Sequence, residues 1–124
     1  MSTSVHNRPV RKVFTNRLGG VSQPPYSSFN LGDHVGDDPA SVAANRKRLA
    51  SVIGLPETSL VWMEQIHSNT VTVVDEANKN SGVIPATDAI IATKRGLALC
   101  VLVADCVPVL ISDTEAGVIA AVHA

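Results

Sequence analysis

Three residues in the second half of the chain could together hold a metal ion: His67, Cys106 and His123. Each lies at the edge of an apolar run, and such runs become strands whose ends often carry functional side chains. Two imidazole rings and one thiolate form a three-ligand set for zinc and leave one coordination position open for water or substrate. The residue types therefore predict a zinc centre, provided that three strand ends meet on one face of the fold.

Two other chemistries use the same residues. Two histidines and a cysteine also describe a blue-copper site, with Met63 as its weak fourth ligand. An oxidase with several copper centres needs many more histidines than the four in this chain, so zinc is favoured over copper. Cys106 could instead be the nucleophile of a cysteine hydrolase, with His67 or His123 as its base. The metal content of the purified protein distinguishes the zinc enzyme from the hydrolase.

The composition of the 124-residue chain argues against several classes of protein. Apolar residues make up 45% of it, which is enough for a hydrophobic core, and a net charge of −1 without a basic block argues against nucleic-acid binding. No apolar run reaches the ~18 residues of a membrane span, and the polar segment Met1–Lys12 does not resemble a signal peptide. Cys100 and Cys106 do not form a secreted disulfide pattern. We expect one cytoplasmic domain over residues 1–124.

The first half of the chain is expected to contain a strand, a long loop and a helix. Val10–Phe14 reads as the strand, and residues 17–38 are rich in glycine and proline and show no helical or strand period. A helix is predicted over Pro39–Ile53, with Asp37 or Asp38 as its cap and a glycine directly after it. A loop of this length in a compact domain is usually functional.

The predicted helix has one apolar stripe at 100° per residue, formed by Val42, Leu49 and Ile53, with Ala43 and Ala50 on its flank. Arg46 falls beside this stripe. A partly buried guanidinium needs an anionic partner, so Arg46 is expected to bind either a carboxylate of the protein or an anionic ligand.

The second half of the chain is rich in short strands. Their expected ranges are Leu60–Met63, Thr70–Val74, Ala89–Ala92, Leu97–Val103, Val109–Ile111 and Val118–Val122. The segment Glu76–Pro85 reads as a polar connection. This spacing indicates hairpins and mixed sheets. One helix followed by many strands favours an α+β fold.

Several short motifs occur in order along nearly the whole chain. They are FTNRLGGVS at 14–22, SFNLG at 28–32, VGDD at 35–38, NR at 45–46, QIH at 65–67, TDA at 87–89, ADCVP at 104–108 and HA at 123–124. The ordered set is far more specific than any one motif. By it the chain resembles the laccase-domain proteins, also called polyphenol oxidase or purine nucleoside phosphorylase family proteins.

The resemblance implies a fold, a metal and an activity. The fold is a layered α+β sandwich with mixed β-sheets inside and helices outside. The zinc ligands fall on His67, Cys106 and His123. Members resemble zinc-dependent enzymes that phosphorolyse adenosine, inosine and methylthioadenosine, and some also deaminate adenosine. Members are about twice as long as this chain and continue beyond the His123-Ala124 motif, so the chain is expected to be an incomplete, N-terminal copy of the fold.

The resemblance also suggests roles for residues around the metal. The functional arginine of the family falls on Arg46, which is expected to bind phosphate unless it only forms a structural ion pair. Asn30, Arg17 and Gln65 are candidates for binding the purine nucleoside, although Gln65 could instead only hold its loop. Asp105, beside the Cys106 thiolate, could orient a ligand histidine or cap a turn.

A non-catalytic function is the remaining alternative. If the chain is only part of a larger fold, its sheets have exposed edges, and exposed edges favour pairing with another chain. Self-association of a domain without enzymatic activity is therefore a third hypothesis, beside the zinc enzyme and the cysteine hydrolase.

Overall fold

The computed structural model describes residues 10–75, 83–104 and 106–124 of the chain. They fall into two compact units. The helix unit comprises Val13–Glu57, and the sheet unit comprises Thr58–Ala124 together with the N-terminal residues up to Lys12. In the part of the chain that is described, no helix is long and apolar enough to cross a membrane.

The helix unit consists of a long loop followed by helix α1 (Pro39–Ile53), with the predicted bounds. The side chain of Asp38 accepts a hydrogen bond from the backbone N–H of Ala40 and caps the first turn. Gly54 ends the helix in the left-handed conformation at φ 77°, where a residue without a Cβ is favoured. Residues 17–38 contain neither helix nor strand, as predicted.

One expectation for this half of the chain is wrong. Val10–Phe14 is not a strand, and Phe14 is 67% exposed. Its apolar residues favour a strand, but the segment takes part in neither sheet, and a strand needs a hydrogen-bonded neighbour. In the apolar stripe of α1, Val42 and Leu49 are buried and Ile53 is half-buried; on its flank, Ala50 is buried and Ala43 is exposed.

The most deeply buried residue of α1 is polar. Asn45 is 1% exposed, and its side chain forms hydrogen bonds with the long loop before the helix. Its Nδ2 donates to the hydroxyl of Ser22 at 2.9 Å and to the carbonyl oxygens of Ser28 and Asn30 at 3.2 and 2.8 Å, while its Oδ1 accepts from the N–H of Val21 at 2.9 Å. These bonds offset the cost of removing the amide from water.

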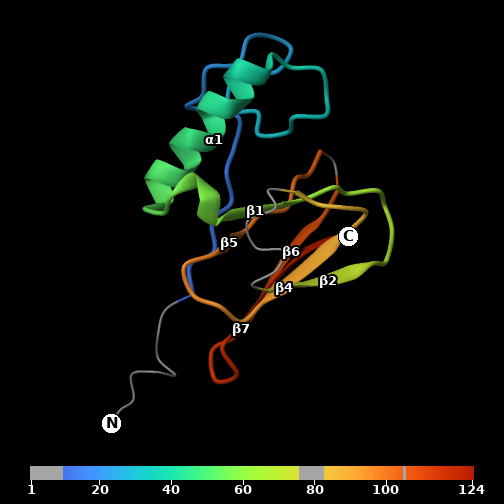
Figure 1. Cartoon of the computed structure of the whole chain (residues 1–124). Coiled ribbons are helices and arrows are strands. Elements are labelled where there is room, and N and C mark those ends of the chain that lie inside the picture. Colours follow the sequence, from blue (N-terminus) through green and yellow to red (C-terminus); the bar gives the residue numbers. More distant parts are fainter. Residues whose placement is uncertain (1–9, 76–82, 105) are drawn as a thin grey trace. The chain divides into compact units, whose positions relative to one another are not determined.

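The sheet unit contains two sheets. A short 3-10 turn, Glu57–Ser59, spans the boundary between the two units in the sequence. In the first sheet, parallel strands follow the order β3 (Val83–Ile84), β1 (Leu60–Met63) and β5 (Ala98–Leu99). The second sheet has the order β2 (Val71–Val74), β4 (Ala89–Ala92), β7 (Val118–His123) and β6 (Pro108–Asp113) (Figure 1). β2 and β4 are parallel, whereas β7 runs antiparallel to β4 and β6.

One predicted strand is much shorter in the structure. The range Leu97–Val103 contains only the two residues of β5, although the N–H of Cys100 still bonds to the carbonyl of Val61. Further along this range, the N–H and the carbonyl of Leu102 bond to the side-chain amide of Gln65 at 2.8 and 2.6 Å. β3 lies within the segment expected to be a connection, and two residues are too few to show a strand period. The rest of that connection, residues 76–82, lies outside the described residues.

One hydrophobic cluster draws on both sheets. Its members are Val61, Met63, Val74, Ile84, Ile90, Ala92 and Ala121, with Leu97, Leu99, Val101, Leu110 and Ile119 packed against it. Aliphatic side chains therefore fill the core, as the scarcity of aromatic residues predicts. The mixed sheets and the helix confirm the α+β class.

Gly20 is predicted to be essential for the packing of the long loop. A Cβ at this position would lie 2.1 Å from the carbonyl oxygen of Ser28 and 2.6 Å from Oδ1 of Asn45, so the backbone would have to move. Gly20→Ala is expected to lower the free energy of unfolding by about 1–3 kcal/mol. Chemical denaturation measures this change.

Gly32→Ala is the matched control. A Cβ there meets nothing closer than 3.4 Å, and the change should alter stability by less than about 1 kcal/mol. Equal effects of the two substitutions would contradict the proposed close approach at Gly20.

Candidate metal centre

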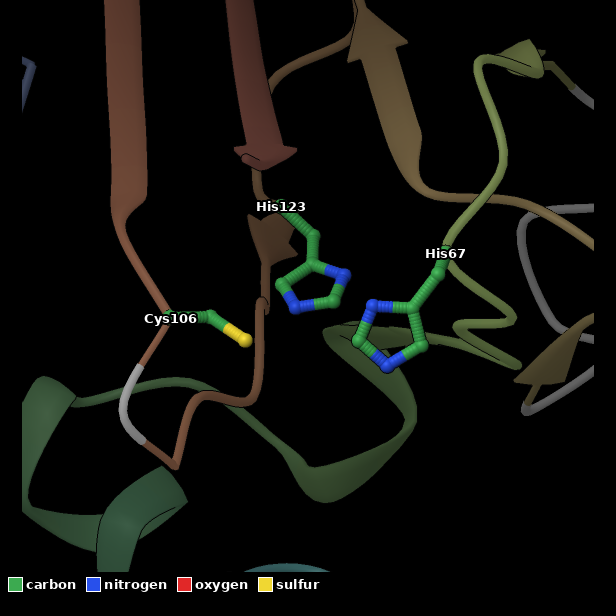
Figure 2. Close-up of side chains that lie close together, drawn as sticks. All are labelled: His67, Cys106 and His123. Carbon is green, nitrogen blue, oxygen red and sulfur yellow. The ribbon is translucent and has the colours of Figure 1, made fainter.

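The structure brings the three predicted ligands together. One ligand atom from each of His67, Cys106 and His123 lies within 4.8 Å of the others. Figure 2 shows the two imidazole rings and the sulfur pointing toward a common centre. The rings of His67 and His123 are 5.0 Å apart between centroids and inclined by 57°, so they are not stacked. Three segments far apart in the sequence thus converge on one point.

The hairpin of β6 and β7 explains how Cys106 and His123 meet. Pro108 pairs with His123, and Val107 and Ala124 exchange two backbone hydrogen bonds of 3.1 and 2.9 Å. Cys106 precedes this ladder and therefore lies beside the end of β7. His67 comes from the loop between β1 and β2, which reaches the same end of the second sheet.

The donor set fits zinc. Nitrogen and sulfur ligands bonded to a tetrahedral zinc at ~2.0–2.3 Å lie about 3.3–3.6 Å from one another. The ligand atoms here, within 4.8 Å, need to approach by little more than 1 Å, which is about the range of small side-chain rotations. Copper is less well supported, because Met63 packs in the hydrophobic cluster and is 5% exposed. That position does not favour it as a fourth ligand.

A buried carboxylate lies directly behind the centre. Asp88, at the start of β4, is 2% exposed, and its Oδ2 lies 2.7 Å from Nδ1 of His123, whose side chain is 6% exposed. The same carboxylate accepts hydrogen bonds from the backbone N–H groups of Ile66, His67 and Ser68 and from the hydroxyl of Ser68. A carboxylate behind a ligand histidine is common in metal sites.

The hydrogen bonds keep Asp88 ionised despite its burial. Burial alone raises the pKa of a carboxyl group, since it disfavours the charged form. The bonds from His123, from Ser68 and from the N–H of Ile66 outweigh this effect and hold the pKa of Asp88 well below its usual value. Asp88 is therefore an acceptor at neutral pH.

Sequence reasoning missed Asp88 and assigned an orienting role to Asp105 instead. Asp105 lies outside the described residues. The signal for Asp88 is its position: a lone carboxylate stands directly before the apolar strand β4 and belongs to the TDA motif. Burial at such a position requires donors, but their identity depends on contacts between distant segments.

Gln65 lies in the sheet unit near His67 in sequence. Both ends of its amide bond to the backbone of Leu102, at 2.6 and 2.8 Å. This geometry agrees with the expectation that Gln65 holds its loop. A contact with substrate stays a prediction.

The other candidate residues lie in the helix unit. Nε of Arg46 donates to the carbonyl of Leu31 at 2.8 Å, and its Nη1 lies 3.8 Å from a carboxylate oxygen of Asp33. An anionic side chain thus lies near the guanidinium, as its partial burial requires, although 3.8 Å is long for a strong pair. Arg17 is exposed.

Asn30 is held within the long loop. Its Nδ2 donates to the carbonyl of Gly32 and to Oδ2 of Asp37, both at 3.1 Å. The hydroxyl of Ser22 also donates to Oδ2 of Asp37 at 2.6 Å. These hydrogen bonds, first that of Ser22 and then that of Asn30, lower the pKa of Asp37. The roles of Asn30, Arg17 and Arg46 toward substrate stay predictions.

Comparison with known proteins agrees with the motifs. The family model described as multi-copper polyphenol oxidoreductase laccase matches residues 11–124. The chain belongs to this family. The match covers both the helix unit and the sheet unit, and it confirms the resemblance inferred from the ordered motifs. The family description names copper, whereas the three ligands here suit zinc.

Curated relatives carry the name purine nucleoside phosphorylase. One from Corynebacterium glutamicum is 71% identical over 123 residues, which are 99% of this chain and 50% of that protein. One from Mycobacterium tuberculosis is 55% identical over 115 residues, or 93% of this chain and 45% of that protein. The chain thus spans about half the length of these relatives.

Solved structures share the fold. The crystal structure of YlmD from Geobacillus stearothermophilus superposes with a TM-score of 0.81 at 32% identity and covers 87% of this chain and 42% of that one. A Neisseria meningitidis protein superposes with a TM-score of 0.76 at 42% identity, with the same coverage of each chain. The α+β arrangement of this chain is therefore shared with experimentally determined structures.

Removal of the thiolate is predicted to weaken metal binding strongly. Cys106→Ser should lower zinc affinity by about 100-fold or more, because a hydroxyl is a far poorer zinc ligand than a thiolate. Elemental analysis and competition with a chromogenic chelator measure the effect. Cys100→Ser is the matched control, since the Cys100 sulfur lies 3.6 Å from the carbonyl oxygen of Ala98 and is not part of the ligand group. Equal zinc affinity of both variants would exclude Cys106 as a ligand.

Proposed function

We propose that the chain carries the metal centre of a zinc-dependent purine nucleoside phosphorylase. The observation that supports this most directly is the convergence of the ligand atoms of His67, Cys106 and His123 within 4.8 Å. The substrates would be phosphate and a purine nucleoside such as adenosine, inosine or methylthioadenosine. The names of the relatives support the substrate class. Since the chain spans about half of their length, its own activity is part of the proposal.

Each candidate residue has a specific task in this reaction. His67, Cys106 and His123 would hold zinc, which when bound supplies a Lewis acid and a source of hydroxide at neutral pH. Deamination of adenosine, which consumes water and releases ammonia, would take place at the same site. The Cys106 thiolate acts as a ligand in this scheme, so it is not available as a nucleophile.

Arg46 would bind phosphate. The planar guanidinium matches two phosphate oxygens at once. The hydrogen bond from Nε of Arg46 to the carbonyl of Leu31 fixes the plane of the guanidinium group. This restricts the direction from which an anion can approach. Asn30, Arg17 and Gln65 are proposed to contact the nucleoside, and Asp105 remains a candidate for orienting the metal ligands.

The phosphate role of Arg46 predicts a specific kinetic change. Arg46→Lys keeps the positive charge but loses the planar guanidinium group that can bind two phosphate oxygens at once. The KM for phosphate should therefore rise at least about tenfold, or 1.4 kcal/mol, while the zinc content stays unchanged. The assay follows release of adenine from adenosine in the presence of phosphate. Arg48→Lys, an exposed change on the same helix, is the control and should leave this KM unaltered.

The same assay tests the activity as a whole. Zinc-loaded protein that releases no adenine in the presence of phosphate contradicts the proposed phosphorylase. Formation of inosine from adenosine without phosphate identifies the deaminase reaction. Full hydrolytic activity after complete removal of metal would instead favour the cysteine hydrolase with Cys106 as nucleophile. A cytoplasmic location stays a prediction.

Self-association through exposed sheet edges also stays a prediction, and an apolar face of the second sheet is a further surface that favours it. The outward side chains of the second sheet are apolar: Val71 and Val73 on β2 are 55% and 56% exposed, and Val109 and Ile111 on β6 are 36% and 53% exposed. The strand register places these residues on one face. Apolar patches of this kind commonly mark interfaces.

A charge on this face is predicted to weaken self-association. Sedimentation velocity of the 13.0 kDa chain should show a concentration-dependent larger species, and Ile111→Lys should shift it toward the monomer. Val52→Lys, which places the same charge at a 67% exposed valine of α1, should not. A monomeric wild-type chain throughout the concentration series would exclude association through this face.

A further inference from the structure

Asp88 connects both histidines of the metal centre. Its Oδ2 contacts Nδ1 of His123 at 2.7 Å and accepts the backbone N–H of His67 at 3.0 Å. The backbone carbonyl of Asp88 also accepts the N–H of His123 at 2.8 Å. One residue therefore holds the ring of one ligand and the backbone of the other.

The loop that carries His67 wraps around the same carboxylate. Three successive backbone N–H groups, those of Ile66, His67 and Ser68, donate to it at 3.0, 3.0 and 2.9 Å, and the Ser68 hydroxyl adds a fourth bond at 2.9 Å. His67 itself has φ 62°, a left-handed conformation that is unfavourable for a residue with a Cβ. The bonds to Asp88 offset this cost and keep the loop in the conformation that aims the ring at the other ligands.

The contact with His123 decides which of its nitrogens can bind a metal. An ionised carboxylate only accepts hydrogen bonds, so Nδ1 must carry the hydrogen. The lone pair then lies on Nε2, at the opposite side of the ring, where it is free to act as a ligand. The structure thus pairs a ligand ring with the group that selects its metal-binding tautomer.

We propose that Asp88 is the positioning residue of this metal centre, which fixes the Nδ1–H tautomer of His123 and holds the left-handed backbone of His67. The role requires a carboxylate. An asparagine has one acceptor oxygen and one donor NH₂ group, and that NH₂ group would face either His123 or the N–H groups of the loop. The inference rests on the metal centre of the proposed function, but its consequences are measurable without any enzymatic assay.

The test is Asp88→Asn, examined by two readouts. The first is the tautomer of His123 in ¹⁵N-labelled, metal-free protein, read from two-bond ¹H–¹⁵N correlations. Wild type should show the Nδ1–H form, and the variant should lose it. The second is zinc affinity, which should fall about 10–100-fold in the variant, as expected for loss of a carboxylate behind a ligand histidine.

Two variants separate positioning from a general effect on folding. Asp113→Asn changes another carboxylate that accepts backbone hydrogen bonds, from Glu115 and Ala116 in the turn after β6, and it should preserve both readouts. Ser68→Ala removes one donor to Asp88 without touching His123, so it should lower stability but keep the Nδ1–H tautomer.

The outcomes that overturn the proposal are distinct from those that overturn the function. A predominant Nε2–H tautomer of His123 in the wild-type protein refutes the proposed role of Asp88. This measurement needs only the wild-type protein, so it tests the proposal even if Asp88→Asn does not fold. Unchanged zinc affinity in folded Asp88→Asn refutes it as well. Protein with the expected tautomer and tight zinc binding but no release of purine would refute the phosphorylase and leave the role of Asp88 intact.

Discussion

The hydrogen bonds around the Asp88 carboxylate are the interaction on which the rest of the sheet unit depends. A charge that is 2% exposed is strongly unfavourable unless donors replace the water it has lost. Five donors do so here, and they come from two segments: residues 66–68 and the end of β7. The carboxylate cannot be satisfied unless these segments meet. Since each of them carries a histidine, the arrangement that satisfies the buried charge is the same one that brings two ligands together.

A buried polar group organises the helix unit in the same way. Asn45 stands on the inner face of α1, where the helical period leads one to expect an apolar side chain, and its amide bonds to four positions in the loop that precedes the helix. A loop without helix or strand leaves many backbone groups without regular partners, and Asn45 supplies several of them. Gly20 belongs to the same arrangement, because only a residue without a side chain fits between the backbone of Ser28 and the amide of Asn45. In each unit, one buried polar residue thus bonds to several groups from another segment of that unit.

Local signals in the sequence predicted much of this fold. The features that were not predicted depend on contacts between residues far apart in the sequence. The bounds of α1 follow from Asp38, Pro39 and Gly54, whose effects on the backbone are independent of the rest of the chain. β1 and β4 follow from compact apolar runs with clear ends. The shortness of β5 could not be predicted from local signals, because part of the predicted range bonds to a distant side chain: the backbone of Leu102 bonds to Gln65, 37 positions away. The three candidate metal ligands were recognisable by residue type and motif, whereas the five donors of Asp88 are visible only once β4, β7 and the loop after β1 are placed in space.

The two sides of the candidate metal centre are held by different interactions, and this bears on metal binding. The histidine side is fixed by a buried carboxylate with five donors, so it can exist before the metal arrives. Cys106 precedes the β6–β7 ladder, in which Pro108 pairs with His123 and Val107 and Ala124 exchange two backbone bonds. Metal binding to a site that is already partly formed costs less conformational entropy than binding that must assemble all ligands. The histidine pair is already in position. Coordination by the Cys106 sulfur would therefore mainly stabilise the end of the β6–β7 hairpin.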